Sequence, residues 1–258
     1  MLANLLAAKG AFVGGWFVLL FLGERFFRAA PPPSSHNRIF RNAGLWLLTI
    51  VFSVGVVAPM TAWGVNQSLW DRPGWMVAGA AGAGFILLDL IILDCWVYWL
   101  HRAYHKVPVM WRLHEVHHRD EFLDTTSAMR FHITEILLSA SLRLILIAVL
   151  AIPLLTVILF ETILLFASFF HHSNLRLPAR LEKVLSCFVV TPSIHWVHHH
   201  AKISDTNSNY AACLSLWDRV FRSKSSMKRT PEMKIGIQGL EDKGFIELLM
   251  MPFRGASI

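Results

Sequence analysis

Histidines occur in short clusters at regular spacings in this chain. The stretch HRAYHKVPVMWRLHEVHH, residues 101–118, holds five of them and follows directly on a strongly apolar segment. Within it, His114, His117 and His118 stand at i, i+3 and i+4, which converge on one side of a helix, and HWVHH at 195–199 repeats the arrangement. Neutral imidazole binds iron, zinc, copper and nickel well. The clusters therefore predict a metal site built from histidine.

Further histidines lie between these two motifs: His132 in RFHITE, and His171 and His172 in FFHHSN. Nine or ten histidines are more than one six-coordinate ion can hold, so the sequence predicts two neighbouring metals. A catalytic zinc keeps about three protein ligands and one water. A redox metal therefore fits this set better than a hydrolytic zinc.

The segments that must position the histidines belong to a membrane protein. Of the 258 residues, 55% are hydrophobic and only 16% are charged, which is outside the range of soluble domains. A membrane-spanning helix needs about 20 apolar residues. The predicted spans are approximately 2–23, 43–65, 76–100, 133–152 and 154–170.

The run from Ile133 to Phe170 is long enough for two short helices, and Pro153 marks the expected turn of a spanning or re-entrant hairpin. Threading the spans alternately places 21 of the 24 Lys and Arg residues on one side, all but Lys9, Arg72 and Arg143. The positive-inside rule assigns that side to the cytoplasm. The histidine clusters share this side, where a lipid can reach a metal from the bilayer.

Two other classes of function are disfavoured. The basic residues, net +7, lie between and after apolar segments and form no basic face of a soluble fold, which argues against nucleic-acid binding. Cys95, Cys187 and Cys213 lie far apart without a CxxC motif, so neither a disulfide framework nor an iron-sulfur cluster is indicated.

One stripe of the third predicted span leads into the site. Asp94, Tyr98, His101 and His105 are spaced i, i+4, i+7 and i+11, so they share a helix face. A carboxylate inside a span usually has a partner and a function. We expect Asp94 to accept a ring N–H from a ligating histidine; a salt bridge to Arg102 is the alternative.

The chain resembles the membrane-bound fatty acid hydroxylase and sterol desaturase superfamily over residues 85–221. The resemblance rests on DCWVYWLHRAYH, LHEVHH, RFHITE, FFHHSN and TPSIHWVHH, followed by NY and LWDRVF, in the family's order. It implies a non-haem di-iron oxygenase that uses O₂ and two external electrons to hydroxylate or desaturate a lipid. At two positions where the family often has glycine, this chain has Ala211 and Arg222. These departures affect the expected turn geometry of the cap and not the metal site.

By motif position, the resemblance implies a set of metal-ligating and catalytic histidines. They are His101, His105, His114, His117, His118, His172, His195, His198 and His199. His132 is either a further ligand or a hydrogen-bonding partner of one, and His171 and His200 are neighbouring hydrogen-bonding residues. Four other polar residues are expected to orient ligands or a bound water, or else to make ordinary hydrogen bonds: Tyr98, Asn174, Asn209 and Asp218.

These observations predict an all-α integral membrane protein of one domain, residues 1–258. Four to five transmembrane or re-entrant helices carry a helical cytoplasmic cap, residues 101–132 and 171–258, which holds a histidine-rich dimetal site. The expected cofactors are two iron ions with O₂ as co-substrate, and zinc can replace iron during expression.

The expected partners are a membrane lipid and a separate electron donor of cytochrome b5, ferredoxin or flavodoxin type. The lipid is an acyl chain, a sterol or hopanoid, a carotenoid or an ether lipid. The membrane is a bacterial inner membrane or, in a eukaryote, the endoplasmic reticulum. Hydroxylation is the main expectation; a desaturase on the same site and a histidine-rich metal transporter are the alternatives.

Overall fold

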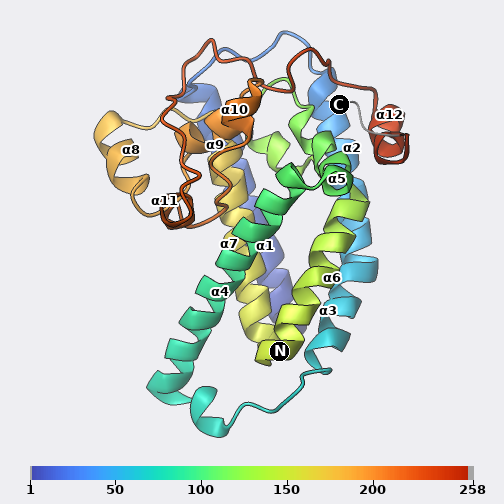
Figure 1. The fold of residues 1–258 in the computed structure, drawn as a ribbon, viewed down its shortest axis with the longest axis vertical. Coiled ribbons are helices and arrows are strands. Elements are labelled where there is room, and N and C mark those ends of the chain that lie inside the picture. Colours follow the sequence, from blue (N-terminus) through green and yellow to red (C-terminus); the bar gives the residue numbers. More distant parts are fainter. Residues whose placement is uncertain (1, 255–258) are drawn as a thin grey trace.

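The computed structural model describes residues 2–254, and their side chains from residue 8 onward. Long helices form a bundle, and short helices and loops form a cap over one end of it (Figure 1). The long helices are α1 (Leu2–Phe26), α2 (Asn37–Phe52) continued by α3 (Ala58–Val65), α4 (Gly79–Lys106), α6 (Ile133–Leu150) and α7 (Leu154–His172). The described part of the chain contains isolated β-bridges and no strand. The all-helical prediction is therefore confirmed.

Four stretches are long and apolar enough to cross a membrane: Asn37–Val65, Gly79–Lys106, Ile133–Leu150 and Leu154–His172. The protein is thus an integral membrane protein. Two of these helices extend past their predicted ends. Helix α4 continues beyond Leu100, and α7 beyond Phe170, so His101, His105 and His172 lie on the same rigid helices that form the spans.

The predicted hairpin at 133–170 is present, and its two helices run the length of the bundle. Ala151 takes a left-handed conformation with φ 51°, and Pro153 precedes the first residue of α7. The turn lies at the end opposite the cap, because Trp70, in the loop between α3 and α4, donates its indole N–H to the carbonyl of Val149 at 3.0 Å. At about 1.5 Å per residue, each helix spans roughly 27 Å, close to the thickness of a bilayer core.

The second span contains a local irregularity with a clear cause. Between α2 and α3, the five residues Ser53–Val57 form a π-helical turn. Pro59 follows at the start of α3. Proline lacks the N–H that an α-helix would use there, and its ring would collide with the carbonyl four residues earlier. The wider π turn lets the span continue through this position.

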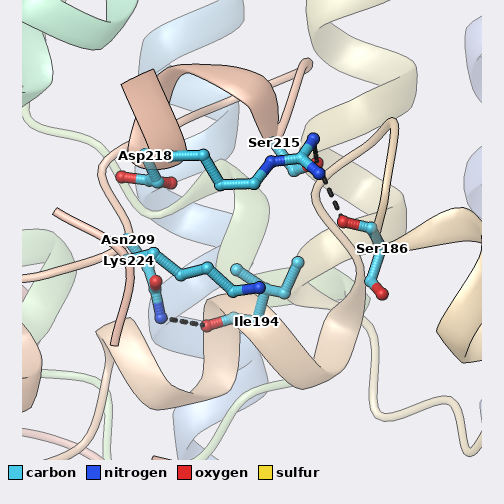
Figure 2. Close-up of a pocket in the computed structure, with 7 residues that line it drawn as sticks. Ser186, Ile194, Asn209, Ser215, Asp218 and Lys224 are labelled. Atoms are coloured by element: carbon cyan, nitrogen blue, oxygen red, sulfur yellow. Dashed lines mark hydrogen bonds between the residues drawn. The ribbon is translucent and has the colours of Figure 1, made fainter. Parts of the chain in front are cut away.

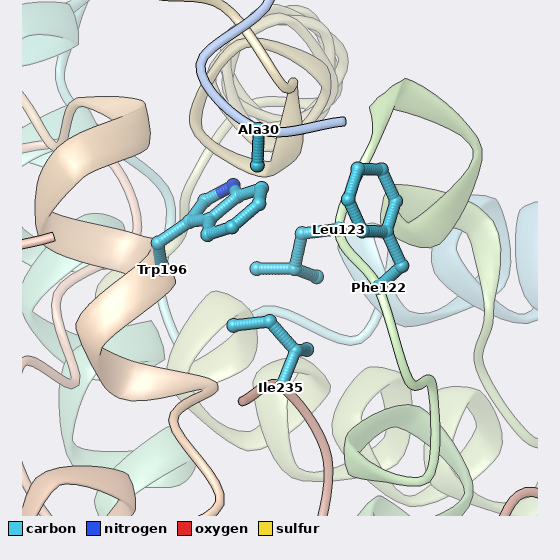
Figure 3. Packing of buried hydrophobic residues seen from close by; sticks show 5 residues of the cluster. All are labelled: Ala30, Phe122, Leu123, Trp196 and Ile235. Carbon is cyan, nitrogen blue, oxygen red and sulfur yellow. The ribbon is translucent and has the colours of Figure 1, made fainter. Parts of the chain in front are cut away.

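The cap is built from α5 (Pro108–His118), the 3₁₀ turn η3 (Thr125–Met129), α8 (Ala179–Leu185), α9 (Pro192–His198), α10 (Ile203–Thr206), α11 (Leu216–Val220) and α12 (Phe245–Met250). Segments far apart in sequence meet in its apolar core, where Ala30, Phe122, Leu123 and Ile235 surround the buried indole of Trp196 (Figure 3). Burying such side chains contributes about 1.5–3 kcal/mol each. This core fixes α9 against the loop that follows α5.

A buried arginine joins the second span to the cap. Arg38, at the start of α2, forms ion pairs with Asp120 and Asp124 and donates to the hydroxyl of Ser127 at 2.8 Å. The acceptors all follow α5, so this network holds the C-terminal end of the helix that carries HEVHH. At the other end of the cap, Leu248 of α12 is fully buried against Leu45 and Val116.

Charged residues inside the bundle are paired. Glu161 of α7 accepts from Lys9 at 3.1 Å and from Arg143 at 2.8 Å, which connects α1, α6 and α7. Near the opposite end from the cap, Arg72 binds both carboxylate oxygens of Asp89 at 2.8 Å. Because an unpaired charge in this environment is costly, these pairs fix how the helices sit against one another.

The Arg72–Asp89 pair provides a test of this fold. Its side chains are only 8% and 3% exposed, so Asp89→Asn should leave the Arg72 cation buried without its counter-charge and cost roughly 3–5 kcal/mol. The thermal midpoint of the detergent-purified protein should fall clearly. Asp71→Asn, at an exposed neighbouring carboxylate, is the matched control. Equal midpoints for the two variants would contradict the assigned role.

Candidate metal centre

The structure brings nine of the histidines into two compact groups. The first group is His101, His105, His114, His118 and His198, and the second is His117, His172, His195 and His199. Within each group, one ring nitrogen of every member lies within 4.8 Å of the others. All nine belong to the set expected from the motifs. Each group has the density of donors that a metal ion requires.

The two HxxHH motifs divide between the groups in opposite ways. On α5, the first and last histidines, His114 and His118, join the first group, and the middle one, His117, joins the second. On α9 the order is reversed, because the middle histidine, His198, joins the first group. An α-helix turns by about 100° per residue. Residues i and i+4 therefore share a direction, while i+3 points about 100° away from i+4.

The two groups are immediate neighbours. The rings of His118 and His199, one from each group, stack with centroids 4.3 Å apart, and those of His114 and His117, also from different groups, are 5.2 Å apart. The pair His195 and His198, again from different groups, is separated by 5.2 Å. The arrangement is therefore one continuous histidine cluster with two points of convergence.

Hydrogen bonds define which ring nitrogen faces each point of convergence. In five histidines, Nδ1 lies beside an oxygen that can only accept a proton, so Nδ1 carries the hydrogen and Nε2 keeps its lone pair. These pairs are His101 with the Tyr210 carbonyl at 2.7 Å, His198 with the Ser208 carbonyl at 2.7 Å, His172 with the Ser168 carbonyl at 2.8 Å, His117 with the Arg130 carbonyl at 3.3 Å, and His114 with the Glu135 carboxylate at 2.7 Å.

The lone pairs so defined point at one another. Nε2 of His101 lies 3.1 Å from Nε2 of His114, and Nε2 of His117 lies 3.1 Å from Nε2 of His172. Two nitrogens without a hydrogen cannot form a hydrogen bond, and at this distance their lone pairs repel. Two ligands at right angles on an ion, each about 2.1 Å from it, stand about 3.0 Å apart. The spacing therefore matches adjacent ligands of one metal ion.

Other nitrogens of the cluster are buried without a partner. They include both ring nitrogens of His105 and of His118, and Nε2 of His198. A buried polar group without a hydrogen bond costs roughly 1–3 kcal/mol and calls for an explanation. An ion in the first group would satisfy one nitrogen of each of these three rings, and the facing Nε2 atoms of His117 and His172 offer donors in the second group, so the residues present fit the expected dimetal site.

Burial keeps the cap histidines in the form that binds metals. Loss of solvation, together with the neighbouring histidines, places the pKa of His117, His118, His195 and His199 well below the usual value. The same burial lowers the pKa of His198 to about 3. These rings are neutral near pH 7, and neutral imidazole is the ligand.

Asp94 has a different role from the one expected. Its carboxylate accepts no ring N–H; it accepts the backbone N–H groups of Cys213 at 3.2 Å and Leu214 at 3.0 Å, and the indole N–H of Trp217 at 2.8 Å. The alternative, an ion pair with Arg102, is also not found among the described contacts. Asp94 lies one turn before Tyr98 and holds the segment 213–217 against α4, which is a positioning role.

Asp218 supports a ligand indirectly. Its two oxygens accept the backbone N–H groups of Tyr210 at 2.8 Å and Ala211 at 3.1 Å, and the Tyr210 carbonyl accepts from His101. Asn209 donates its side-chain amide to the carbonyl of Ile194 on α9 at 3.2 Å (Figure 2). These residues fix the loop whose carbonyls orient His101 and His198.

The remaining polar residues from the sequence analysis stand farther from the convergence points. Tyr98 shares a hydrogen bond with the Ser223 hydroxyl at 2.7 Å. The side chain of Asn174 accepts the backbone N–H of Ala30 at 3.0 Å and so ties the segment after α1 to the end of α7. The hydrogen bonds of both side chains go to residues other than histidine, so both act on the architecture of the cap.

Besides His36, which precedes α2, three histidines stay outside both groups. His132 precedes α6 and caps it: its Nδ1 lies 3.2 Å from the N–H of Thr134, and its Nε2 lies 3.1 Å from the carbonyl of Leu249. His200 shares a hydrogen bond with Asp205 at 2.8 Å. The ring of His171 is tilted against that of His195, with their centroids 4.1 Å apart. His171 therefore packs beside the cluster, and His132 and His200 face other partners.

Glu135 is a candidate site residue that the sequence did not reveal. Arg143 pairs with Glu161, and Glu135 binds the ring of His114. The signal available in the sequence was a carboxylate in the first turn of a membrane span, three residues after His132. Such a carboxylate needs a partner. A carboxylate on the far nitrogen of a ligand fixes its tautomer and raises its basicity.

A pocket lies beside the loop that carries Asn209 and Asp218, and it is too small for a lipid. It is lined by Ser186, Ile194, Asn209, Ser215, Asp218, Arg219 and Lys224, and its cavity volume is about 10 Å³ (Figure 2). That is the room of about one water molecule. We therefore do not assign the substrate to this pocket.

Glu135 gives a direct test of the centre. Glu135→Gln keeps the size of the side chain but removes the charge that orients His114, so metal affinity should fall about 10–100-fold. Metal content after dialysis against a graded chelator series measures the change. The control is Glu232→Gln, at an exposed carboxylate. Unchanged retention in Glu135→Gln would show that the His114–Glu135 contact does not tune the site.

Comparison with known proteins agrees with this geometry. The chain is 29% identical over 169 residues to the ornithine lipid hydroxylase OlsE of Rhizobium tropici. This match covers 65% of this chain and 50% of that protein. It is 29% identical over 153 residues to the alkylglycerol monooxygenase of Danio rerio, covering 59% of this chain and 33% of that protein. It is 22% identical over 160 residues to the cholesterol 25-hydroxylase of Rattus norvegicus, covering 62% of this chain and 53% of that protein.

The chain thus spans between a third and about half of the length of these relatives. No solved structure matches it. The profile of the fatty acid hydroxylase family matches residues 86–223, which is more than half of the chain and includes both histidine groups. The relatives are named as hydroxylases and a monooxygenase, and this chain belongs to the fatty acid hydroxylase family.

Proposed function

We propose that this protein is an O₂-dependent dinuclear iron enzyme that hydroxylates a C–H bond of a membrane lipid. The observation that carries the proposal is the pair of Nε2 contacts at 3.1 Å, in which lone pairs without hydrogens face each other at the spacing of adjacent metal ligands. Bound iron supplies the redox chemistry that lets O₂ react with an unactivated C–H bond. Lipid hydroxylation in general agrees with the names of the relatives.

The two ions would have unequal surroundings. The group with five histidines would leave one position of a six-coordinate ion open, and the group with four would leave two. The His117 group thus offers more room for an exogenous ligand. Because neither group includes a carboxylate, the charge of the metals would be balanced from outside the ligand set, and Glu135 is the nearest carboxylate that contacts a ligand.

The chain's own residues orient the ligands and keep water out. Backbone carbonyls hold the Nδ1 protons of His101 and His198, so these rings cannot rotate away from the metal. The histidines of α5 and α9 are buried, which removes competing water from the ligand positions. The preference for iron over zinc or copper rests on the family and its redox reaction, since an imidazole set alone accepts all three.

The substrate would approach from the bilayer. His101 and His172 lie at the ends of spans α4 and α7, so the centre is at the boundary of the hydrocarbon layer. A transporter would place its site near the membrane midplane, so this position disfavours the transporter alternative. The relatives act by name on an ornithine lipid, an alkylglycerol and cholesterol. We propose a lipid with an accessible chain or ring as the substrate class.

We further propose that the site faces the cytoplasm and that a separate donor supplies the electrons. The cap end carries nearly all the Lys and Arg residues of the chain, which supports the cytoplasmic assignment. The donor would be of cytochrome b5, ferredoxin or flavodoxin type. Residues 1–258 would form a single membrane domain with its cap, since α1 packs on α7, and Leu45 of α2 and Leu248 of α12 pack on Val116 of α5.

Metal analysis tests the dinuclear site first. The wild-type protein, purified in mild detergent, should hold about two irons per chain, and His117→Ala should lose metal while remaining folded and monodisperse. The control is His200→Ala, which alters a histidine of the same sequence run that lies outside both groups. Wild-type metal content in His117→Ala, or an equal loss in His200→Ala, would contradict the ligand assignment.

Lipid analysis tests the reaction. Cells that express the wild-type protein under ¹⁸O₂ should contain a lipid with one ¹⁸O atom that is absent from His117→Ala cells and from cells without oxygen. High-resolution mass spectrometry of total lipid extracts measures this product. A product that has lost two hydrogens without gaining oxygen would identify a desaturase instead. No new lipid in cells with metal-loaded protein and a reducing partner would contradict the proposed activity.

A further inference from the structure

Two short cap helices form one surface through backbone contacts. The residues after α8 run beside the start of α11: the N–H of Ser215 donates to the carbonyl of Phe188 at 3.1 Å, and the N–H of Val190 donates to that of Cys213 at 2.9 Å. The hydroxyl of Ser215 also donates to the carbonyl of Ser186 at 2.9 Å (Figure 2). We call the outward side of α8, α11 and the residues next to them the α8–α11 face.

The α8–α11 face exposes large apolar side chains. Phe188 is 66% exposed, Val184 58% and Val220 55%, and Leu181 and Leu216 are also exposed. Single exposed apolar residues are ordinary, but five of them on two joined helices and the residues next to these helices mark a contact surface. These side chains therefore indicate contact with an apolar partner.

The charges on the same face are all positive. Arg180, Lys183 and Arg222 are exposed there. The carboxylates of these segments turn inward, since Glu182 accepts from the hydroxyl of Thr191 and Asp218 accepts the backbone N–H of Tyr210. The outward surface thus combines apolar side chains with cations and presents no carboxylate of α8 or α11.

The position of the face relative to the bilayer follows from its packing on α4. The ring of Phe221, directly after α11, lies 5.0 Å from that of Tyr98 and 4.8 Å from that of Trp99. Trp99 is near the end of the apolar part of α4 and is itself 46% exposed. Tryptophan at a span end is typical of the membrane interface. Helix α11 lies beside the cap end of α4 (Figure 1), so the face adjoins the exposed surface of α4 at Trp99, where we place the membrane interface.

We propose that the α8–α11 face lies on the membrane surface, with its apolar side chains in the interfacial layer and its Arg and Lys side chains on the phosphates of anionic lipids. Surfaces of this composition bind in the plane of the interface, with apolar groups about 5–10 Å into the headgroup and acyl boundary, and anionic lipids attract the basic residues beside them. A soluble protein partner would not explain why the face joins the lipid-facing surface of α4.

The contact would hold two ligand-bearing helices in place. Helix α8 lies in the chain between α7, which carries His172, and α9, which carries His195. Segment 213–217 is held by Asp94 of α4. Seating of the face on the leaflet would keep the cap at a fixed height over the end of the spans. The proposal rests on the protein being integral to a membrane, and it stands whichever metal the site holds.

The native Cys187 allows a direct test, because it is exposed between Ser186 and Phe188. In a Cys95→Ala/Cys213→Ala background, a nitroxide on Cys187 is examined by power-saturation electron paramagnetic resonance, with the protein in liposomes of zwitterionic and anionic lipids. The matched control carries the label at Ile203→Cys in the same background with Cys187→Ala. Ile203 is an exposed apolar residue of α10 on the same cap.

The label at Cys187 should collide several-fold more with O₂, which partitions into the bilayer, than with a water-soluble nickel chelate, and Ile203→Cys should show the opposite order. The label should shift to greater depth when anionic lipid replaces zwitterionic lipid, and Arg180→Glu/Lys183→Glu should abolish the shift. Preference for the nickel chelate at Cys187 would overturn the proposal. Protection from both reagents, or spin-spin broadening, would identify a protein partner or a second copy and would also overturn it.

A second measurement guards against a misfolded variant. Cys213 is buried and Cys95 is half-buried, so brief labelling of the unsubstituted chain modifies mainly Cys187. The same collision order in that sample would support the proposal without any substitution. The opposite order would overturn it.

Discussion

Nine neutral imidazoles must present their lone pairs to two neighbouring points inside a buried volume, and the rest of the structure depends on this constraint. Each ring can rotate, so a hydrogen-bond acceptor must hold the ring proton on the nitrogen that faces away from the point of convergence. For five rings, that role falls to four backbone carbonyls and one carboxylate. The carbonyls of Ser208 and Tyr210 belong to a loop that Asp218 secures. Hydrogen bonds outside the cluster therefore determine whether it can bind a metal.

The sequence predicted the local features well, because they depend on local periodicity. Four of the five predicted spans, the hairpin around Pro153 and the helical HEVHH segment follow from apolar runs and from 3.6-residue spacing, and the structure contains them. Periodicity does not specify which distant segment a side chain meets. Asp94 was therefore given a histidine partner when its acceptors lie on 213–217, and Glu135 was missed because His114 is 21 residues away. Which of the two groups each histidine joins likewise depends on how α5 lies relative to α9.

One departure from the family pattern has a physical explanation in the backbone. Arg222 adopts a left-handed conformation with φ 56°, which glycine adopts without steric cost and which explains a family preference for glycine at this place. Asn209, in the loop beside His198, has φ 52° and is a residue type that tolerates this region. Ala211 is not among the positive-φ residues, and its side chain is fully buried near Tyr98. The turn geometry is thus retained although the glycine at 222 is absent.

The opposite division of the two HxxHH motifs means that both histidine groups share helices α5 and α9. In the proposed dinuclear centre, each ion would take ligands from both helices, so the first ion to bind would fix their relative position. That ordering would also assemble the second group, which would then bind its ion with less loss of conformational entropy. Filling of the centre would consequently be cooperative, and by thermodynamic linkage removal of either ion would loosen the ligands of the other. The shared helices would make the pair of ions a single thermodynamic unit.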